Sequence, residues 1–225
     1  MRQIPLSIAP RPLATFDNFI TGANAAAVAQ LRTLALAPAA PVYLWGPSGS
    51  GKTHLLRALS GAVQQRGAHA GWFDADVAAP WHLDESSSLF VIDTCEALDE
   101  AQQRAAFALF VAAVGQGAQV AAAGTVPPVD LPLREDLRTR LGWGLVFGLQ
   151  PLGESEARTA LRREADRRGI FLPDEVMDYL LTRFSRDLKH LMALLERLDE
   201  FALSEQRGVT VPLLRKMFED SGALS

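Results

Sequence analysis

One octapeptide, GPSGSGKT, constrains the fold of this chain more than any other segment. It consists of Gly46, Pro47, Ser48, Gly49, Ser50, Gly51, Lys52 and Thr53, and it fits the P-loop pattern G-x-x-x-x-G-K-[ST] without a mismatch. A β-prone run, 42–45, precedes it, and helix formers follow over 54–66. The glycines let backbone N–H groups surround phosphate oxygens, and Lys52 would reach the β- and γ-oxygens. The sequence therefore predicts a nucleotide site between a strand and a helix.

A carboxylate suited to magnesium follows the apolar run 89–92. This residue, Asp93, would hold Mg²⁺ together with the Thr53 hydroxyl, partly through water. The structural alternative is that Asp93 only caps the strand end. Many P-loop ATPases place a second carboxylate directly after this Asp, but Thr94 occupies that position here, and Glu96 is the candidate to compensate.

Strands and helices alternate up to residue 150, and helices alone follow. Strands are expected at 42–45, 71–73, 89–92, 120–123 and 145–149, and helices at 23–36, 54–66, 99–115, 155–168, 173–184, 187–206 and 212–220. Alternation predicts an α/β domain with a mostly parallel sheet covered on both faces. We therefore expect an extended arm over 1–12, a P-loop domain over 13–150 and a small all-helical domain over 151–225.

Charge and hydropathy exclude several classes of protein. The net charge of −4 does not favour a phosphate-neutralising DNA surface, and the basic residues of 162–168 alternate with acidic ones. Apolar runs fall far short of the about 20 residues that cross a bilayer, and the N-terminus lacks the continuous apolar core of a secretory signal. The single cysteine, Cys95, is expected to be a buried structural residue. These features predict a cytoplasmic protein without a membrane segment.

Three further segments resemble the DnaA branch of the AAA+ ATPases. TFDNF (15–19), with Gly22 and Asn24, resembles the segment that lines the adenine pocket, which implies base contacts by Phe19 and Asn24. RTRLGWG (138–144) is similar to the arginine-finger segment, with Arg140 at the finger position. SRDLKHL (185–191) resembles the sensor-2 helix, with Lys189 in the place of the usual Arg. The resemblance implies an AAA+ domain followed by a helical lid.

Each of these assignments has a local alternative. Arg140 could stack on Trp143 instead of reaching the γ-phosphate of a neighbouring subunit, and Lys189 could be a solvated lysine on a helix. Thr125 stands in the sensor-1 region, where DnaA would have an acidic residue. Together with Thr94, it implies weak intrinsic hydrolysis.

The start of the chain narrows the resemblance to the Hda family of regulatory DnaA inactivators. In that family the arm binds the β sliding clamp of DNA polymerase III, and QIPLSI (3–8) resembles such a motif. Gln3 would form hydrogen bonds, while Ile4, Leu6 and Ile8 would fill an apolar groove. The alternative is an arm that folds back onto the ATPase domain. No residues remain for the helix-turn-helix domain of DnaA, so direct sequence-specific DNA binding is not expected.

The resemblance implies a nucleotide-bound regulator with ADP or ATP and Mg²⁺ as cofactors. Tethered to the DNA-loaded clamp, it would stimulate hydrolysis of ATP bound to DnaA and so repress re-initiation of replication. Its partners would be the clamp and DnaA, with a homo-oligomer as a further option, and the clamp would place it at the nucleoid. The alternative is an autonomous ATPase of the DnaA branch, such as a helicase loader.

Overall fold

The chain folds into an α/β unit, Leu13–Pro151, and a helical unit that begins at Leu152. The computed structural model describes residues 13–37, 39–82, 84, 86–184 and 188–220. The expected clamp motif at 3–8 lies outside the described residues. Each unit is described by itself below.

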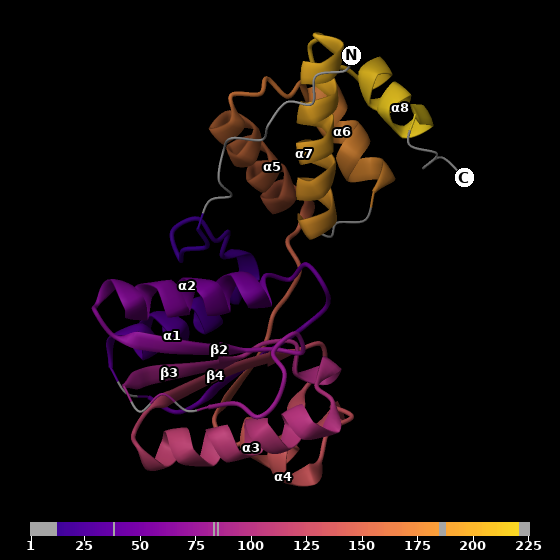
Figure 1. Ribbon diagram of the computed structural model, residues 1–225. Helices are drawn as coiled ribbons and strands as arrows, with labels where there is room; N and C mark the ends of the chain where they lie inside the picture. Colours follow the sequence, from indigo (N-terminus) through magenta and orange to yellow (C-terminus); the bar gives the residue numbers. More distant parts are fainter. Residues whose placement is uncertain (1–12, 38, 83, 85, 185–187, 221–225) are drawn as a thin grey trace. The chain divides into compact units, whose positions relative to one another are not determined.

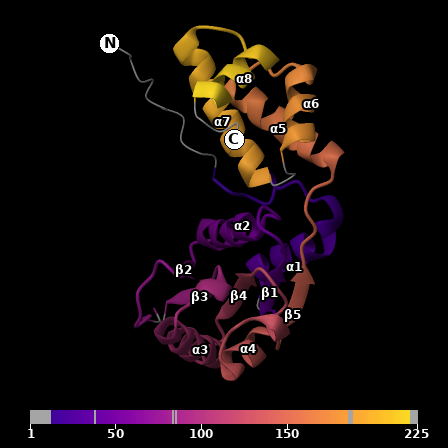
Figure 2. The ribbon, with the colours of Figure 1, turned by 90° about the vertical axis from the view of Figure 1, so that its right-hand side faces the viewer.

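A five-stranded parallel sheet forms the centre of the α/β unit, with the strand order β2-β3-β4-β1-β5 (Figure 2). Its strands are β1 (Val42–Trp45), β2 (His69–Phe73), β3 (Ser87–Ile92), β4 (Gln119–Gly124) and β5 (Leu145–Gly148). The middle strands β3, β4 and β1 are buried on both faces, which explains their continuous apolar runs. Because all five strands run in one direction, their carboxyl ends meet at one edge.

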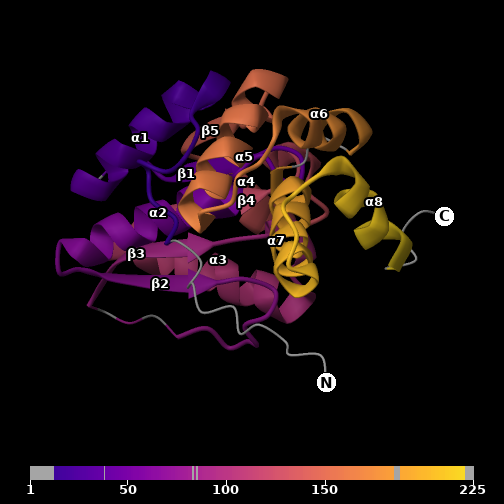
Figure 3. The same cartoon turned by 90° about the horizontal axis from the view of Figure 1, so that it is seen from above.

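Helices cover both faces of this sheet. On one face, α1 (Ala25–Leu36) and α2 (Lys52–Gln65) lie side by side (Figures 1 and 3). The other face carries α3 (Glu100–Gly115) and α4 (Glu135–Leu141). Among the described residues of this unit, three short 3-10 turns occur, at Gly22–Asn24, Cys95–Ala97 and Pro128–Asp130. The predicted α/β class with a parallel sheet is confirmed.

The helical unit has a hydrophobic core of its own. It comprises α5 (Glu154–Arg168), α6 (Asp174–Arg183), α7 (Leu188–Glu205) and α8 (Val211–Asp220). Fully buried leucines from all four helices meet in this core: Leu161, Leu180, Leu195 and Leu214. The predicted all-helical domain is therefore present. In the part of the chain that the structure describes, no helix is both long and apolar enough to cross a membrane.

Candidate nucleotide-binding site

The P-loop joins β1 to α2 in a conformation that requires glycine at two close approaches. Gly46 and Gly51 have φ values of +149° and +94°. A Cβ on Gly46 would lie 2.6 Å from the carbonyl oxygen of Leu149, and one on Gly51 would lie 2.6 Å from Cε2 of Phe19. Any larger residue would push the loop away from the sheet or from the Phe19 ring. The motif therefore has the backbone shape that its glycines predict.

The ammonium group of Lys52 lies inside this loop. Its Nζ donates hydrogen bonds to the carbonyl oxygens of Gly46, at 2.7 Å, and Pro47, at 3.0 Å. Burial lowers the pKa of Lys52, whereas the negative charges of Glu96 and then Asp93 raise it. A cation fixed at this point can compensate phosphate charge.

Ser50 supplies an independent sign that the loop fits phosphate. Its side chain is buried, and its Oγ has no hydrogen-bond partner among residues that the structure describes. A buried hydroxyl without a partner is costly unless a ligand satisfies it. The N-terminus of α2, which begins directly after Gly51, adds partial positive charge to the same loop. These features suit the phosphates of a nucleotide.

Thr53 and Asp93 form the pair expected to hold magnesium. The Thr53 hydroxyl donates to Oδ2 of the buried Asp93 at 2.7 Å, and the Thr94 amide donates to Oδ1 at 2.9 Å. Oxygen ligands of this kind suit Mg²⁺, which keeps several waters in such sites. No group of three or more metal-ligating side chains occurs within the described ranges. The remaining ligands of Mg²⁺ would therefore come from water and the nucleotide.

The chain turns sharply after Asp93 and brings Glu96 back to the sheet edge. Thr94 is exposed and has a positive φ of 50°, and the 3-10 turn Cys95–Ala97 follows. The Glu96 Oε2 accepts a hydrogen bond from the Thr125 amide at 3.1 Å. Cys95 is buried as expected, and burial raises the pKa of its thiol.

Tyr43 is a contributor to this edge that our sequence analysis missed. Its hydroxyl donates to the carbonyl oxygen of Val126 at 3.0 Å, so the loop after β4 is held by both Tyr43 and Glu96. The sequence did contain a signal, since Tyr43 is the one hydroxyl-bearing residue in the apolar strand VYLW. A buried Tyr hydroxyl usually needs a hydrogen-bond partner.

The two residues assigned to the adenine pocket have different surroundings. Phe19 packs against Gly51, and its ring centroid lies 5.5 Å from that of His54, so it adjoins the P-loop. Asn24 is buried and binds the backbone of Gln150: its Nδ2 donates to the carbonyl at 3.0 Å, and its Oδ1 accepts from the amide at 2.8 Å. Contact of either residue with a base stays a prediction.

Arg140 lies in the last turn of α4, beside an open groove of about 750 Å³. The groove is lined by Phe107, Arg134, Glu135, Asp136, Thr139, Arg140 and Trp143. The Arg140 guanidinium is 4.9 Å from the centre of the exposed Trp143 ring, so the local stacking considered from sequence does occur. The finger role of Arg140 stays a prediction.

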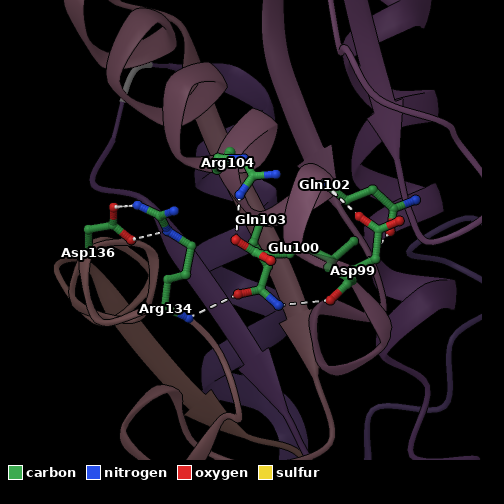
Figure 4. A network of polar contacts seen from close by, with 8 residues as sticks. Asp99, Glu100, Gln102, Gln103, Arg104, Arg134 and Asp136 are labelled. Atoms are coloured by element: carbon green, nitrogen blue, oxygen red, sulfur yellow. Dashed lines mark hydrogen bonds and ion pairs between the residues drawn. The ribbon is translucent and has the colours of Figure 1, made fainter.

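A polar network fixes the start of α4 against α3 (Figure 4). The Arg134 amide donates to Oε1 of Gln103 at 3.0 Å, and its guanidinium pairs with both carboxylate oxygens of Asp136. On α3, Asp99 and Gln102 form a reciprocal cap. Arg140 therefore projects from a helix whose first turn is anchored.

Lys189 belongs to the helical unit. It lies in the first turn of α7, and its side chain is exposed. Its action on a nucleotide stays a prediction.

Comparison with known proteins agrees with the fold. The family model "Hda, lid domain" matches residues 154–218, and the model "Bacterial DnaA ATPase domain" matches 11–71. Domain III of DnaA from Thermotoga maritima aligns with a TM-score of 0.82 at 22% identity, covering 94% of this chain and 98% of that one. AMPPCP-bound DnaA from Aquifex aeolicus aligns with a TM-score of 0.74 at 20% identity, over 94% of this chain and 71% of that one.

A branch migration motor shares the architecture as well. RuvB of Thermotoga maritima aligns with a TM-score of 0.70 at 18% identity, covering 93% of this chain and 72% of that chain. The structural likenesses establish the fold, while the two sequence models narrow the relationship to DnaA and Hda. The chain is therefore an AAA+ protein related to DnaA and Hda, with a C-terminal domain of the Hda lid type.

Proposed function

We propose that this protein is a nucleotide-bound regulator that stimulates hydrolysis of ATP held by DnaA while tethered to the DNA-loaded β sliding clamp. This activity would repress re-initiation of replication. The observation that carries the proposal is the joint match of a DnaA ATPase model to residues 11–71 and an Hda lid model to 154–218. Binding through the clamp would place the protein at the nucleoid.

The nucleotide site would hold ADP or ATP with Mg²⁺. Lys52 and the P-loop amides would compensate phosphate charge, and the Ser50 hydroxyl would gain the partner that it lacks within the described chain. Thr53 and Asp93 would hold Mg²⁺, which neutralises phosphate charge when bound. The AMPPCP bound to Aquifex aeolicus DnaA supports an adenine nucleotide as the ligand.

Arg140 would act on the ATP of its partner. A guanidinium brought to a γ-phosphate stabilises charge that develops in the transition state, an effect worth about 10³–10⁵ in rate in other NTPases. The surface groove and the anchored start of α4 support this role, because they present Arg140 from a fixed element to a partner. The chain would then contribute to catalysis in trans without being an efficient ATPase.

The arm would supply the tether. Gln3, Ile4, Leu6 and Ile8 would bind the clamp, as the resemblance implies. A pull-down with purified clamp tests this directly: the double variant Gln3→Ala, Leu6→Ala should lose binding and keep its melting temperature. Retained clamp binding together with a lowered melting temperature would instead favour an arm folded onto the protein.

The deciding experiment follows single-turnover phosphate release from labelled ATP preloaded on DnaA, with DNA-loaded clamp present. Wild-type protein should accelerate release, and Arg140→Ala should not, although it still binds nucleotide and clamp. Equal acceleration by both proteins would exclude Arg140 as the finger. Fast turnover by this chain alone, without clamp, would identify an autonomous ATPase.

A further inference from the structure

The two helices on one face of the sheet, α1 and α2, carry no carboxylate. No Asp or Glu occurs between residues 18 and 73, although the whole chain has 26 of them. This segment forms α1, β1, α2 and β2, so we call the surface of its two helices the α1–α2 face (Figures 1 and 3). The other face of the sheet carries both signs of charge, as in the ion pairs Arg104–Glu100 and Arg134–Asp136. The net charge of −4 is therefore an average that hides a positive face.

Two arginines of this face have guanidinium groups without an ion-pair partner among the described residues. Arg57 and Arg66 are both exposed. The Arg57 guanidinium lies 5.8 Å from the centre of the Trp72 ring, and that of Arg66 makes one long hydrogen bond, 3.5 Å, to the carbonyl oxygen of Leu36. Because a helix rises 1.5 Å per residue, the two arginines lie about 13 Å apart along the axis of α2. Both cations can meet an anionic partner.

Two carboxylates border the α1–α2 face without reaching these arginines. Asp17 accepts a hydrogen bond from the Arg32 guanidinium at 2.8 Å, so the one arginine of α1 is already paired. Asp74 follows β2 and accepts from Nε1 of Trp72 and from the Asp76 amide, each at 3.0 Å. The positive charge of the face therefore rests mainly on α2.

We propose that the α1–α2 face contacts the phosphate backbone of duplex DNA without reading the base sequence. This inference goes beyond the proposed function, because it requires neither the nucleotide nor DnaA. The planar guanidinium forks of Arg57 and Arg66 match the oxygens of a phosphate. The exposed amides of Gln64 and Gln65, on the same part of α2, are further donors of the kind that bind DNA phosphates.

A membrane of anionic lipids fits this face less well than DNA. A helix that lies on a membrane presents an apolar stripe outward. The apolar residues of α2 are instead buried in the core of the unit: Leu55, Leu56, Leu59 and Val63. Among the described residues of the two helices, Leu36 alone is a large apolar side chain with high exposure. Charge without apolar surface favours a phosphodiester backbone.

Contacts with two phosphates predict weak binding that depends strongly on salt. Each neutralised phosphate contributes about −0.9 to the slope of log affinity against log salt concentration, so Arg57 and Arg66 together should give a slope of about −1.8. Such a contact is weak for the free protein. It becomes effective where a tether raises the local concentration of DNA, as the proposed clamp contact would.

Fluorescence anisotropy of a labelled DNA duplex, titrated with the whole protein at several salt concentrations, tests the proposal. Arg57→Gln and Arg66→Gln should each weaken binding by roughly tenfold at about 50 mM salt and make the slope shallower by about 0.9. Asp17→Asn should strengthen binding, because it frees the guanidinium of Arg32. Duplexes of unrelated sequence should bind equally well.

Matched variants separate a local contact from net charge and from structure. Arg163→Gln removes the same charge from an exposed arginine of α5 that stands beside Glu164, and it should leave the slope unchanged. Arg57→Lys keeps the charge but not the planar group that lies over Trp72, and it should keep most of the slope.

Four results would overturn the proposal. The double variant Arg57→Gln, Arg66→Gln could retain the wild-type slope, or Arg163→Gln could show the same loss, which would make net charge the cause. Loss of binding to anionic lipid vesicles at unchanged DNA binding would identify a membrane face. Salt-sensitive self-association that the double variant abolishes, without DNA binding, would make a second copy the partner. Because DNA binding is measured on this protein alone, failure of the DnaA assay leaves the result intact, and the reverse also holds.

Discussion

The guanidinium of Arg140 rests on the indole ring of Trp143, 4.9 Å from its centre. Trp143 is 63% exposed, so this cation–π contact lies at the surface and contributes about 0.5–1 kcal/mol. A side chain held this weakly leaves its resting place at small cost. The contact therefore gives the Arg140 side chain a preferred position, and breaking it costs little when a partner binds.

Replacing Trp143 should reduce the stimulation of DnaA-bound ATP hydrolysis far less than replacing Arg140. We expect Trp143→Leu to change the stimulation of DnaA-bound ATP hydrolysis by no more than about fivefold, the factor that corresponds to an exposed cation–π contact. Arg140→Ala should lower it by about 10³ or more, because it removes charge that stabilises the transition state. Single-turnover phosphate release measures both. A loss in Trp143→Leu as large as that in Arg140→Ala would show that the ring itself meets the partner.

The buried hydroxyl of Ser50 should favour the nucleotide-bound state. In Ser50→Ala the ligand-free protein should melt at the same or a higher temperature, because a buried polar atom without a described partner is removed. ADP affinity should fall by roughly tenfold or more, since hydrogen bonds to charged groups are worth about 1.5–3 kcal/mol. Thermal unfolding and calorimetry of the same preparations give both quantities.

Lys52→Ala is the comparison for that variant. Its loss of ADP affinity should exceed that of Ser50→Ala, because a full charge is removed from the loop. Wild-type ADP affinity in Ser50→Ala would contradict a phosphate contact by this hydroxyl. Wild-type affinity in a folded Lys52→Ala protein would contradict the P-loop assignment.

The sequence predicted the sheet and the phosphate loop because both depend on local information. Buried parallel strands appear as apolar runs, and the P-loop pattern specifies a strand before it and a helix after it. The helix α4 was not predicted, because its seven residues, EDLRTRL, are too few to show a helical period. Its position matters, since it carries Arg140.

Contacts between distant residues could not be predicted in the same way. The bond between Glu96 and Thr125 depends on β3 and β4 being neighbours in the sheet, and the chain between them forms α3. The pair of Asn24 and Gln150 is separated by 126 residues. Residue types and spacing along one chain do not define such pairs, whereas strand order does.

Glu164 makes the stability of the helical unit depend on pH. Hydrogen bonds from Arg167, and then from Arg168, hold the pKa of Glu164 below its usual range, against the opposing effect of burial. A carboxyl with a lowered pKa in the folded state stabilises above its unfolded pKa of about 4.3, and this stability is lost as the pH falls through the folded value.

Glu164→Gln tests this dependence. At pH 7 the variant should lose about 0.5–1 kcal/mol of the free energy of unfolding, because each of its two ion pairs, with Arg167 and Arg168, contributes about 0.3–0.5 kcal/mol. The difference from wild type should shrink as the pH is lowered from 7 to 3, because folded Glu164 takes up its proton as the pH falls through its lowered pKa. Urea unfolding at the two pH values measures it. A difference independent of pH would mean that packing, not charge, sets the contribution of Glu164.

Asn24 should stabilise the α/β unit, because it joins the 3-10 turn before α1 to Gln150, two residues after the end of β5. Asn24→Ala leaves the amide and the carbonyl of Gln150 without their partner, which costs about 1–3 kcal/mol of the free energy of unfolding. Asn18→Ala is the control, because Asn18 makes its hydrogen bonds within an exposed local turn, so its replacement should cost less of the free energy of unfolding.

Since both polar groups of the Asn24 amide are used by the backbone, ADP affinity measured well below the melting temperature should change little in Asn24→Ala. A large loss of ADP affinity at nearly unchanged stability would instead demonstrate the adenine contact that the resemblance to DnaA implies.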